Sequence, residues 1–511
     1  AGNISIDVRD SVSLVGESAI NSSLVIGGTG KSGDITIKAN SLSLANSARL
    51  QANTIGKGDA GNIYVHVDDF VSLKDNTIPN ISTQIRTSVD PGGVGKVGTI
   101  DIQARSLSIT GGAQLLAEVF RPVGRSPGGQ SQGGGNIKIK ADSVELSGSG
   151  NGLSSGLVTA TEEGAIGPAG NITVNTDTFR IADGAIVSAQ TFNQSDGGNV
   201  TINATTFEAV NGGQILTTTS SSGKAGTITV NADRITLSGS DSTFADRKEK
   251  AKFGDRVQNE GSASGLFAST RTGSTGQGGN IAIATGDLIV RDGAAVSVSN
   301  LGSGDAGNLD ITARSISLDQ GNLTARSNSG EGGNINLGVQ DLLLLRNNSQ
   351  ISTTAGNNQT GGGNGGSINI KAGFIIAPPG ENSDITANAF KGKGGNVDIN
   401  AQGIFGIEFR PDLTDPQDNQ TNDITATSER GPQGTVAINQ PDVTPQVGLV
   451  ELPENVVDVA GLVVQNVCVA KTDQGSELTV TGRGGLPDSP NTALRTDDTW
   501  EDWRITQPDK S

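Results

Sequence analysis

Short alternations of apolar and polar residues recur along most of this chain, and a glycine precedes each one. In residues 279–284, Gly-Asn-Ile-Ala-Ile-Ala, the two isoleucines fall on one side and the alanines on the other, which is typical of a half-buried strand. Every copy has Ile, Val or Leu two and four residues after the glycine. We call these residues anchor glycines; the 14 copies are at positions 2, 33, 61, 98, 135, 170, 198, 226, 279, 307, 333, 366, 395 and 434. The chain is therefore built from a repeated unit.

Each unit contains two further alternations. After Ile281 and Ile283, the apolar positions continue at Leu288 and Val290 and then from 294 to 298, with polar turns at 285–287 and 291–293 between them. One unit of three short strands cannot bury its apolar edge alone, whereas stacked units can. Hairpin signals do not organise the chain, which disfavours an antiparallel meander. We predict an all-β fold, a right-handed parallel β-helix (β-solenoid) of about 14 coils over residues 1–440.

The first residues of the unit have predicted structural roles. We interpret the anchor glycine as a corner residue that can adopt a positive φ. The next residue is Asn in nine of the 14 copies, and we expect these side chains to hydrogen-bond from coil to coil as an amide ladder. In the copy after Gly333, we expect Ile335 and Leu337 to face the core and Asn336 to face solvent.

Four segments depart from the repeat and are predicted to be loop insertions: residues 119–134, 147–169, 238–265 and 411–434. The third contains a basic cluster within an acidic protein, and its members are Arg247, Lys248, Lys250, Lys252 and Arg256. Such a cluster is either a docking loop for an anionic polysaccharide or another partner, or simply a solvated loop. We consider these five residues a candidate interaction loop.

The repeat stops near Asn439. Residues 441–511 are predicted to be a carboxy-terminal cap and tail, because the exposed end of a β-helix is an open sheet edge that needs covering. Valines and alanines between 456 and 467 follow helical spacing, which favours a short amphipathic helix in the cap.

Charge and composition narrow the possible partners. The net charge of −17 makes nucleic acid or an anionic membrane an unfavourable partner. A single cysteine excludes a disulfide framework. The sequence has no run of 18 apolar residues that would predict a transmembrane helix.

Catalytic chemistry finds little support in the residue types. The one histidine, His66, is predicted to lie on the outer face of a strand, without a second histidine for a metal. Adjacent acids at 68–69, 162–163 and 497–498 point apart, unlike the facing carboxyl groups of glycosidases. Gly-Asp motifs at 58–62 and 304–308 lack the nine-residue recurrence of calcium repeats. We expect no catalytic residue, cofactor or metal.

The Gly-Asn-Ile-x-Ile repeats, followed by LPENVVDVAGLVVQNVC and ELTVTGRGGLPDSPNTALRTDDTWEDWR, resemble the filamentous haemagglutinin-type exoproteins of cyanobacteria. This resemblance implies two-partner secretion through an outer-membrane β-barrel transporter, a cell-surface location and a role in adhesion or aggregation, with a surface glycan as a possible ligand. The family's amino-terminal secretion domain does not occur here, so we expect a carboxy-terminal fragment. An autotransporter passenger would continue into a membrane barrel, which WRITQPDKS does not suggest.

Two classes of function remain open: a non-enzymatic surface adhesin or structural rod, and an extracellular protein that binds or cleaves polysaccharide.

Overall fold

The computed structural model describes residues 1–441, except 76–81, 125, 151, 251–257, 358–360, 414–415 and 417–418. The chain divides into two units, Ala1–Asp442 and Val443–Ser511. Apart from residue 441, the predicted cap and tail lie outside the described residues. Every described strand and helix belongs to the first unit.

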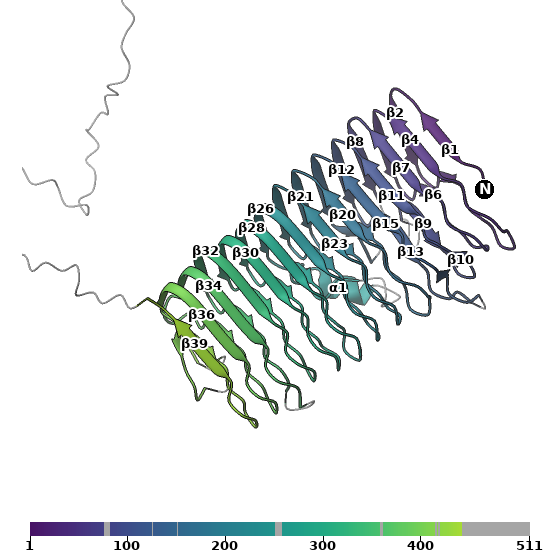
Figure 1. The fold of residues 1–511 in the computed structure, drawn as a ribbon. Helices are drawn as coiled ribbons and strands as arrows, with labels where there is room; N and C mark the ends of the chain where they lie inside the picture. Colours follow the sequence, from purple (N-terminus) through teal and green to yellow (C-terminus); the bar gives the residue numbers. More distant parts are fainter. Residues whose placement is uncertain are drawn as a thin grey trace, which may run out of the picture. The chain divides into compact units, whose positions relative to one another are not determined.

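The first unit is a stack of parallel coils, so the predicted parallel β-helix is confirmed (Figure 1). One strand follows each of the 14 anchor glycines, and each of these strands pairs in parallel with that of the next coil. In chain order they are β1 (Ile4–Asp7), β4 (Ile35–Ala39), β7 (Ile63–Val67), β11 (Thr99–Gln103), β15 (Asn136–Lys140), β20 (Ile172–Asn175), β23 (Val200–Asn203), β26 (Ile228–Ser238), β28 (Ile281–Arg291), β30 (Leu309–Asp319), β32 (Ile335–Arg346), β34 (Ser367–Ile376), β36 (Asn396–Phe405) and β39 (Thr435–Asn439).

These strands belong to a 21-stranded sheet, which we call sheet A. In the early coils a bend separates each first strand from a second one: β2 (Ser11–Val15), β5 (Ser41–Ala45), β8 (Phe70–Lys74), β12 (Ser106–Thr110), β16 (Ser143–Ser147), β21 (Thr178–Ala182) and β24 (Thr206–Val210). From β26 onward most coils join both arms in one long strand. The turn predicted at 285–287 is therefore part of β28 rather than a break between strands.

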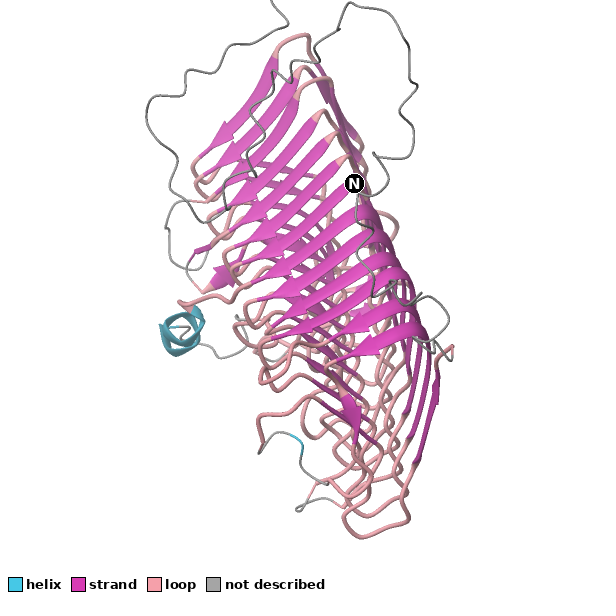
Figure 2. Cartoon of the chain, turned by 90° about the vertical axis from the view of Figure 1, so that its left-hand side faces the viewer, coloured by secondary structure: helices cyan, strands magenta, loops and turns pink. Residues whose placement is uncertain are grey.

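One strand from each of the first 13 coils, together with β37 (Glu408–Phe409) of the thirteenth coil, forms a 14-stranded sheet, which we call sheet B. Figure 2 shows the strands of successive coils stacked side by side. The members of sheet B are β3 (Ala19–Asn21), β6 (Arg49–Gln51), β9 (Gln84–Val89), β13 (Gln114–Val119), β19 (Gly156–Val158), β22 (Ile186–Ser188), β25 (Gln214–Leu216), β27 (Gly265–Phe267), β29 (Ala295–Ser297), β31 (Asn322–Thr324), β33 (Gln350–Ser352), β35 (Asp384–Thr386), β37 and β38 (Asp423–Thr425). Two short pairs stand apart: β10 (Val94–Gly95) with β14 (Gln130–Ser131), and β17 (Ser149–Gly150) with β18 (Leu153–Ser154).

The core runs through the stack between the two sheets. The alternation predicts its members, since Ile281, Ile283, Leu288 and Val290 are all buried in it. In the same way Ile335 and Leu337 are buried, and Asn336 between them faces outward. Burial of apolar side chains, worth about 1.5–3 kcal/mol each, therefore links every coil to the next.

The anchor glycines are required for a reason other than the predicted one. The structure gives none of them a positive φ. Instead, a Cβ added to Gly307 would lie 1.7 Å from the carbonyl oxygen of Gly279 in the preceding coil, and one added to Gly170 would lie 1.5 Å from that of Gly135. The corners of successive coils approach so closely that a side chain has no space.

The ladder after the anchor glycines is confirmed, with a difference in its hydrogen bonds. The Asn171 side-chain oxygen accepts from the backbone N–H of Asn199 at 2.9 Å, and the Asn199 oxygen accepts from that of Thr227 at 2.8 Å. Direct amide-to-amide bonds also occur, as between Asn334 and Asn308 at 3.0 Å. The asparagines thus connect mainly side chain to backbone.

The predicted insertions are shorter than their sequence limits. The segment 147–169 includes β19, and 411–434 includes β38, both of which are strands of sheet B with core residues Leu157 and Ile424. The segment 238–265 contains the one helix of the described residues, α1 (Phe244–Lys250).

Candidate functional site

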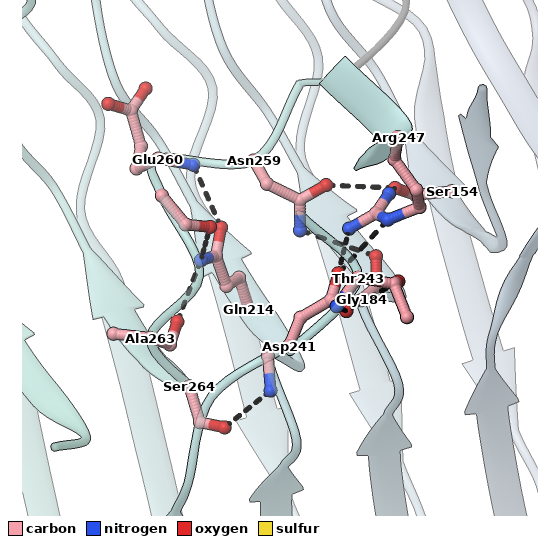
Figure 3. Close-up of polar contacts among 12 residues, drawn as sticks. Ser154, Gly184, Gln214, Asp241, Thr243, Arg247, Asn259, Glu260, Ala263 and Ser264 are labelled. Carbon is pink, nitrogen blue, oxygen red and sulfur yellow. Dashed lines mark hydrogen bonds and ion pairs between the residues drawn. The ribbon is translucent and has the colours of Figure 1, made fainter. Parts of the chain in front are cut away.

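The described parts of the insertion between β26 and β27, which flank residues 251–257, pack against the coils (Figure 3). Arg247 on α1 has a side chain that is 9% exposed and forms an ion pair with Asp241. Its Nε donates to Asp241 Oδ2 at 3.0 Å, and its Nη1 donates to Ser154 Oγ at 3.2 Å. Burial alone would raise the pKa of Asp241, but hydrogen bonds from Thr243 and Arg247 outweigh it and lower the pKa. The pair is therefore ionised.

Two glycines of neighbouring turns leave space for this ion pair. A Cβ on Gly184 would lie 2.4 Å from Arg247 Nη2, and one on Gly212 would lie 2.3 Å from Asp241 Cβ. Both glycines also have positive φ, 77° and 85°. The turns at Gly184 and Gly212 thus leave a space for the ion pair, which side chains at these two positions would fill. We call this space the seat of the insertion.

The returning segment of the insertion is also held by polar contacts. Ser154 Oγ donates to Asn259 Oδ1 at 2.9 Å, and Glu260 N donates to Gln214 Oε1 at 2.9 Å. The buried Gln214 donates in turn to the carbonyl oxygen of Ala263 at 2.7 Å. Glu260 forms an ion pair with Arg271 at 2.9 Å. The insertion is thus fixed to side chains of several coils.

The basic cluster predicted in this insertion is divided by the structure. Arg247 is buried in the seat, whereas Lys248 is exposed. Lys250 ends α1, and Lys252 and Arg256 lie outside the described residues. The contacts of Arg247 identify it as a residue that attaches the insertion to the coils.

Surface hollows follow the bend between the two arms of sheet A. One of about 770 Å³ includes Gln103, Lys140 and Asn175, and one of about 670 Å³ includes Arg314, Gly338 and Lys371. Strand pairing places Gln103, Lys140 and Asn175 in one outward row, to which Gly338 and Lys371 also belong. The bend is therefore a discontinuous groove along the stack, lined by side chains at equivalent places in successive coils.

Amide ladders lie beside this groove. Asn203 donates to Asn175 and Asn231 donates to Asn203, both at 2.8 Å. A third, smaller hollow of about 300 Å³ includes Asn336 and Asn369, which are joined by a hydrogen bond of 2.8 Å. An amide is thus presented on three successive coils in the first row and on two in the second, at a spacing of about 4.8 Å.

His66 faces outward, as predicted. Its Nε2 lies 4.0 Å from Asp101 Oδ1, and its side chain is 40% exposed. Of the neighbouring acids, Asp69 forms an ion pair with Arg105, and Asp68 is exposed. The acids at 497–498 lie outside the described residues.

The local sequence pattern does not reveal one pair of acidic residues, Glu118 and Glu162, because they belong to different coils. Glu118 on β13 is buried, and its pKa is raised well above its usual value by burial first and then by the charge of Glu162. Arg86 opposes this rise. A carboxyl group with a raised pKa beside a second acid is an arrangement that acid–base catalysis uses. The Glu118 residue is only 4% exposed, however, which keeps a polymeric substrate from its carboxyl group.

The calcium-like motifs have structural contacts. Asp59 Oδ1 accepts from Lys96 N at 2.9 Å, and Asp305 Oδ1 accepts from Glu331 N at 3.0 Å. Among the residues that the structure describes, no three His, Cys, Asp or Glu side chains are grouped to hold a metal ion. Within the same residues, no helix is long and apolar enough to cross a membrane.

Comparisons of the chain with models of protein families, with curated proteins and with solved structures found no match. The fold places the chain among the parallel β-helices, and the resemblance to haemagglutinin-type exoproteins stays a prediction.

Proposed function

We propose that this chain is a secreted, non-enzymatic adhesin of the cell surface, exported through an outer-membrane β-barrel transporter. The observation that carries the proposal is the alignment of outward residues in register on sheet A, which gives one polar group per coil from Lys140 through Asn175 and Asn203 to Asn231, next to a groove. Many equivalent weak contacts along one surface provide attachment by multivalency, without a single deep pocket.

The resemblance of the Gly-Asn-Ile-x-Ile repeats and of the segments after Pro441 to haemagglutinin-type exoproteins supports this function. Within the alternative function, an extracellular protein that binds or cleaves polysaccharide, the groove supports binding. Cleavage has weaker support, because Glu118, the carboxyl group whose pKa is raised by burial and by the charge of Glu162, is buried away from a polymeric substrate.

The proposal is tested by coating inert beads with the purified chain and measuring their attachment to bacterial cells and to polysaccharide films in a flow cell. We expect retention well above that of beads coated with an acidic globular protein of equal charge. Retention no higher than that of these control beads, on every surface tested, would contradict an adhesive role. Release of new reducing ends from the films would favour the enzymatic alternative.

A further inference from the structure

The strands β32, β34 and β36, toward the green end of the stack in Figure 1, carry a row of polar side chains on their first arm and a pair of exposed phenyl rings on their second arm. The hollow of about 670 Å³ between them includes Gly373 and Gln402, which directly precede Phe374 and Gly403 in the chain. We call this place the β32–β36 groove; it comprises Asn336, Gly338, Asn369, Lys371, Phe374, Asp398 and Phe405. The hollow of about 300 Å³ and the hollow of about 670 Å³ share Gly338 and Lys371, so they adjoin at this place.

The apolar wall is a pair of phenyl rings that face solvent. Phe374 and Phe405 are 44% and 55% exposed, and their stacked rings have centroids 6.5 Å apart. Gly403 lies against both rings, since a Cβ there would be 2.9 Å from Phe405 and 3.1 Å from Phe374. This glycine lets the rings cover the strand as a platform. Exposed aromatic rings cost free energy and commonly mark binding surfaces.

The polar wall is an oriented ladder. Asn336 Nδ2 donates to Asp310 Oδ1 at 2.6 Å, and Asn369 Nδ2 donates to Asn336 Oδ1 at 2.8 Å. Asp398 is exposed one coil further on, opposite Asn369 in the strand pairing. The groups are therefore held in place before any ligand arrives, which lowers the entropy cost of binding.

The floor between the walls is open because of Gly338. A Cβ added there would lie no closer than 3.8 Å to another atom, and this glycine has no positive φ. Neither close contact nor backbone conformation requires glycine here. The missing side chain instead leaves the hollow beside Lys371 empty.

Sugar rings fit this combination. A pyranose has an apolar face of C–H groups, which stacks on aromatic rings, and an edge of hydroxyl groups, which pair with amides and carboxylates. The ladder repeats along the stack at about 4.8 Å, which is comparable with the advance per sugar in an extended β-linked chain. A peptide strand has no sheet edge to join on this face, because neighbouring coils already pair with β34 on both sides.

Charge selects among polysaccharides. In and beside the groove, the carboxylates of Asp310, Asp341 and Asp398 outnumber the cations of Lys371 and Arg314. The whole chain carries a net charge of −17. This field repels a polyanion. We propose that the β32–β36 groove binds one chain of a neutral, extended, β-linked polysaccharide that lies along the coil stack. The inference rests on the proposed function and deepens it, since it names the ligand class of the adhesive surface.

The test is calorimetric titration of the full chain with neutral hexasaccharides of β-linked glucose, xylose and mannose, and with a hexamer of galacturonate. We expect binding of at least one neutral hexamer, with the galacturonate hexamer at least tenfold weaker. Gly338→Gln fills the hollow, and the double variant Phe374→Ala/Phe405→Ala removes the platform. Each is expected to weaken binding at least tenfold.

The control is Thr201→Gln, which changes an outward residue of β23 on the same sheet and should leave the affinity unchanged. Gly338→Gln should retain the circular dichroism and urea midpoint of the parent chain. No binding of any neutral hexamer, equal affinity in all variants, or preference for galacturonate would overturn the inference. Coated beads that attach to cells despite such a result would leave the adhesive function standing, whereas hexamer binding without attachment would reject that function alone.

Discussion

The close stacking of anchor glycines predicts a large effect of a single methyl group. In Gly307→Ala the new Cβ would lie 1.7 Å from the Gly279 oxygen, about half of an ordinary contact distance. The two coils must therefore separate by more than an ångström at this corner. Backbone conformation plays no part, because Gly307 has no positive φ.

The cost depends on the contacts that the separation disturbs. Overpacking of this kind costs about 1–3 kcal/mol. Two hydrogen bonds between the coils, Asn308 N to Asn280 Oδ1 and Ile281 N to Asn308 O, both at 3.0 Å, add about 1 kcal/mol each when broken. Reduced freedom of the unfolded chain returns about 0.4–1 kcal/mol. The expected net destabilisation is about 2–4.6 kcal/mol.

Substitutions at two other glycines distinguish a steric cause of the destabilisation from a cause in the backbone conformation. Gly338→Ala has open space and no positive φ, so it should be neutral or stabilising by up to about 1 kcal/mol. Gly293→Ala also has open space but a φ of 82°, so only the backbone cost of about 1–2 kcal/mol applies. The assay is urea unfolding followed by far-ultraviolet circular dichroism, with comparison of the first transition, since coils can unfold in stages. A Gly307→Ala protein as stable as Gly338→Ala would refute the steric explanation.

Three further predictions concern burial. The raised pKa of Glu118 means that its folded form holds a proton which the unfolded chain releases near pH 4.3. Stability should thus fall as pH rises from there to the folded pKa, and Glu118→Gln should raise the urea midpoint at pH 8 more than at pH 4. Arg247→Met leaves the Asp241 carboxylate buried without its cationic partner, which should lower the free energy of unfolding by about 3–5 kcal/mol. Adding Asp241→Asn to the same chain should restore much of this stability. Equal losses of stability in the single and double variants would argue against the ion pair. Ile335→Asp should create a trypsin-sensitive region at β32, since a buried unpaired charge costs several kcal/mol, whereas Asn336→Ala should resist trypsin as the parent does.

The sequence predicts the coils well because the repeat and the fold share one period. Each coil places Ile, Val or Leu at the same two positions after its anchor glycine, and strand pairing such as Ile281 with Leu309 stacks them directly. Local alternation is sufficient to find such a core. The role of the glycine itself required the neighbouring coil, because its limiting contact is with a residue about 28 positions away.

The surface features cannot be predicted from the local sequence either, because they also depend on residues of other coils. Ser154 and Asn259 are 105 residues apart, so the seat of the insertion has no signal in its own sequence. The sequence therefore groups Arg247 with the other basic residues of the predicted interaction loop, although its side chain is buried. The stacked rings of Phe374 and Phe405 lie on neighbouring coils, so local alternation does not reveal that they pair.

The register of the stack is the claim on which the ladders, the seat and the groove all depend. It is tested by cysteine pairs in a Cys468→Ser background. Asn203 and Asn231 are direct partners in the strand pairing, and a separation of about 4.8 Å permits a disulfide. Asn203 and Thr229 lie on the same face but are displaced by two residues, which places them beyond the roughly 7 Å limit for a disulfide. Mild oxidation should cross-link Asn203→Cys/Asn231→Cys within the chain and leave Asn203→Cys/Thr229→Cys as thiols. Equal cross-linking of both pairs, or faster cross-linking of the displaced pair, would contradict the register.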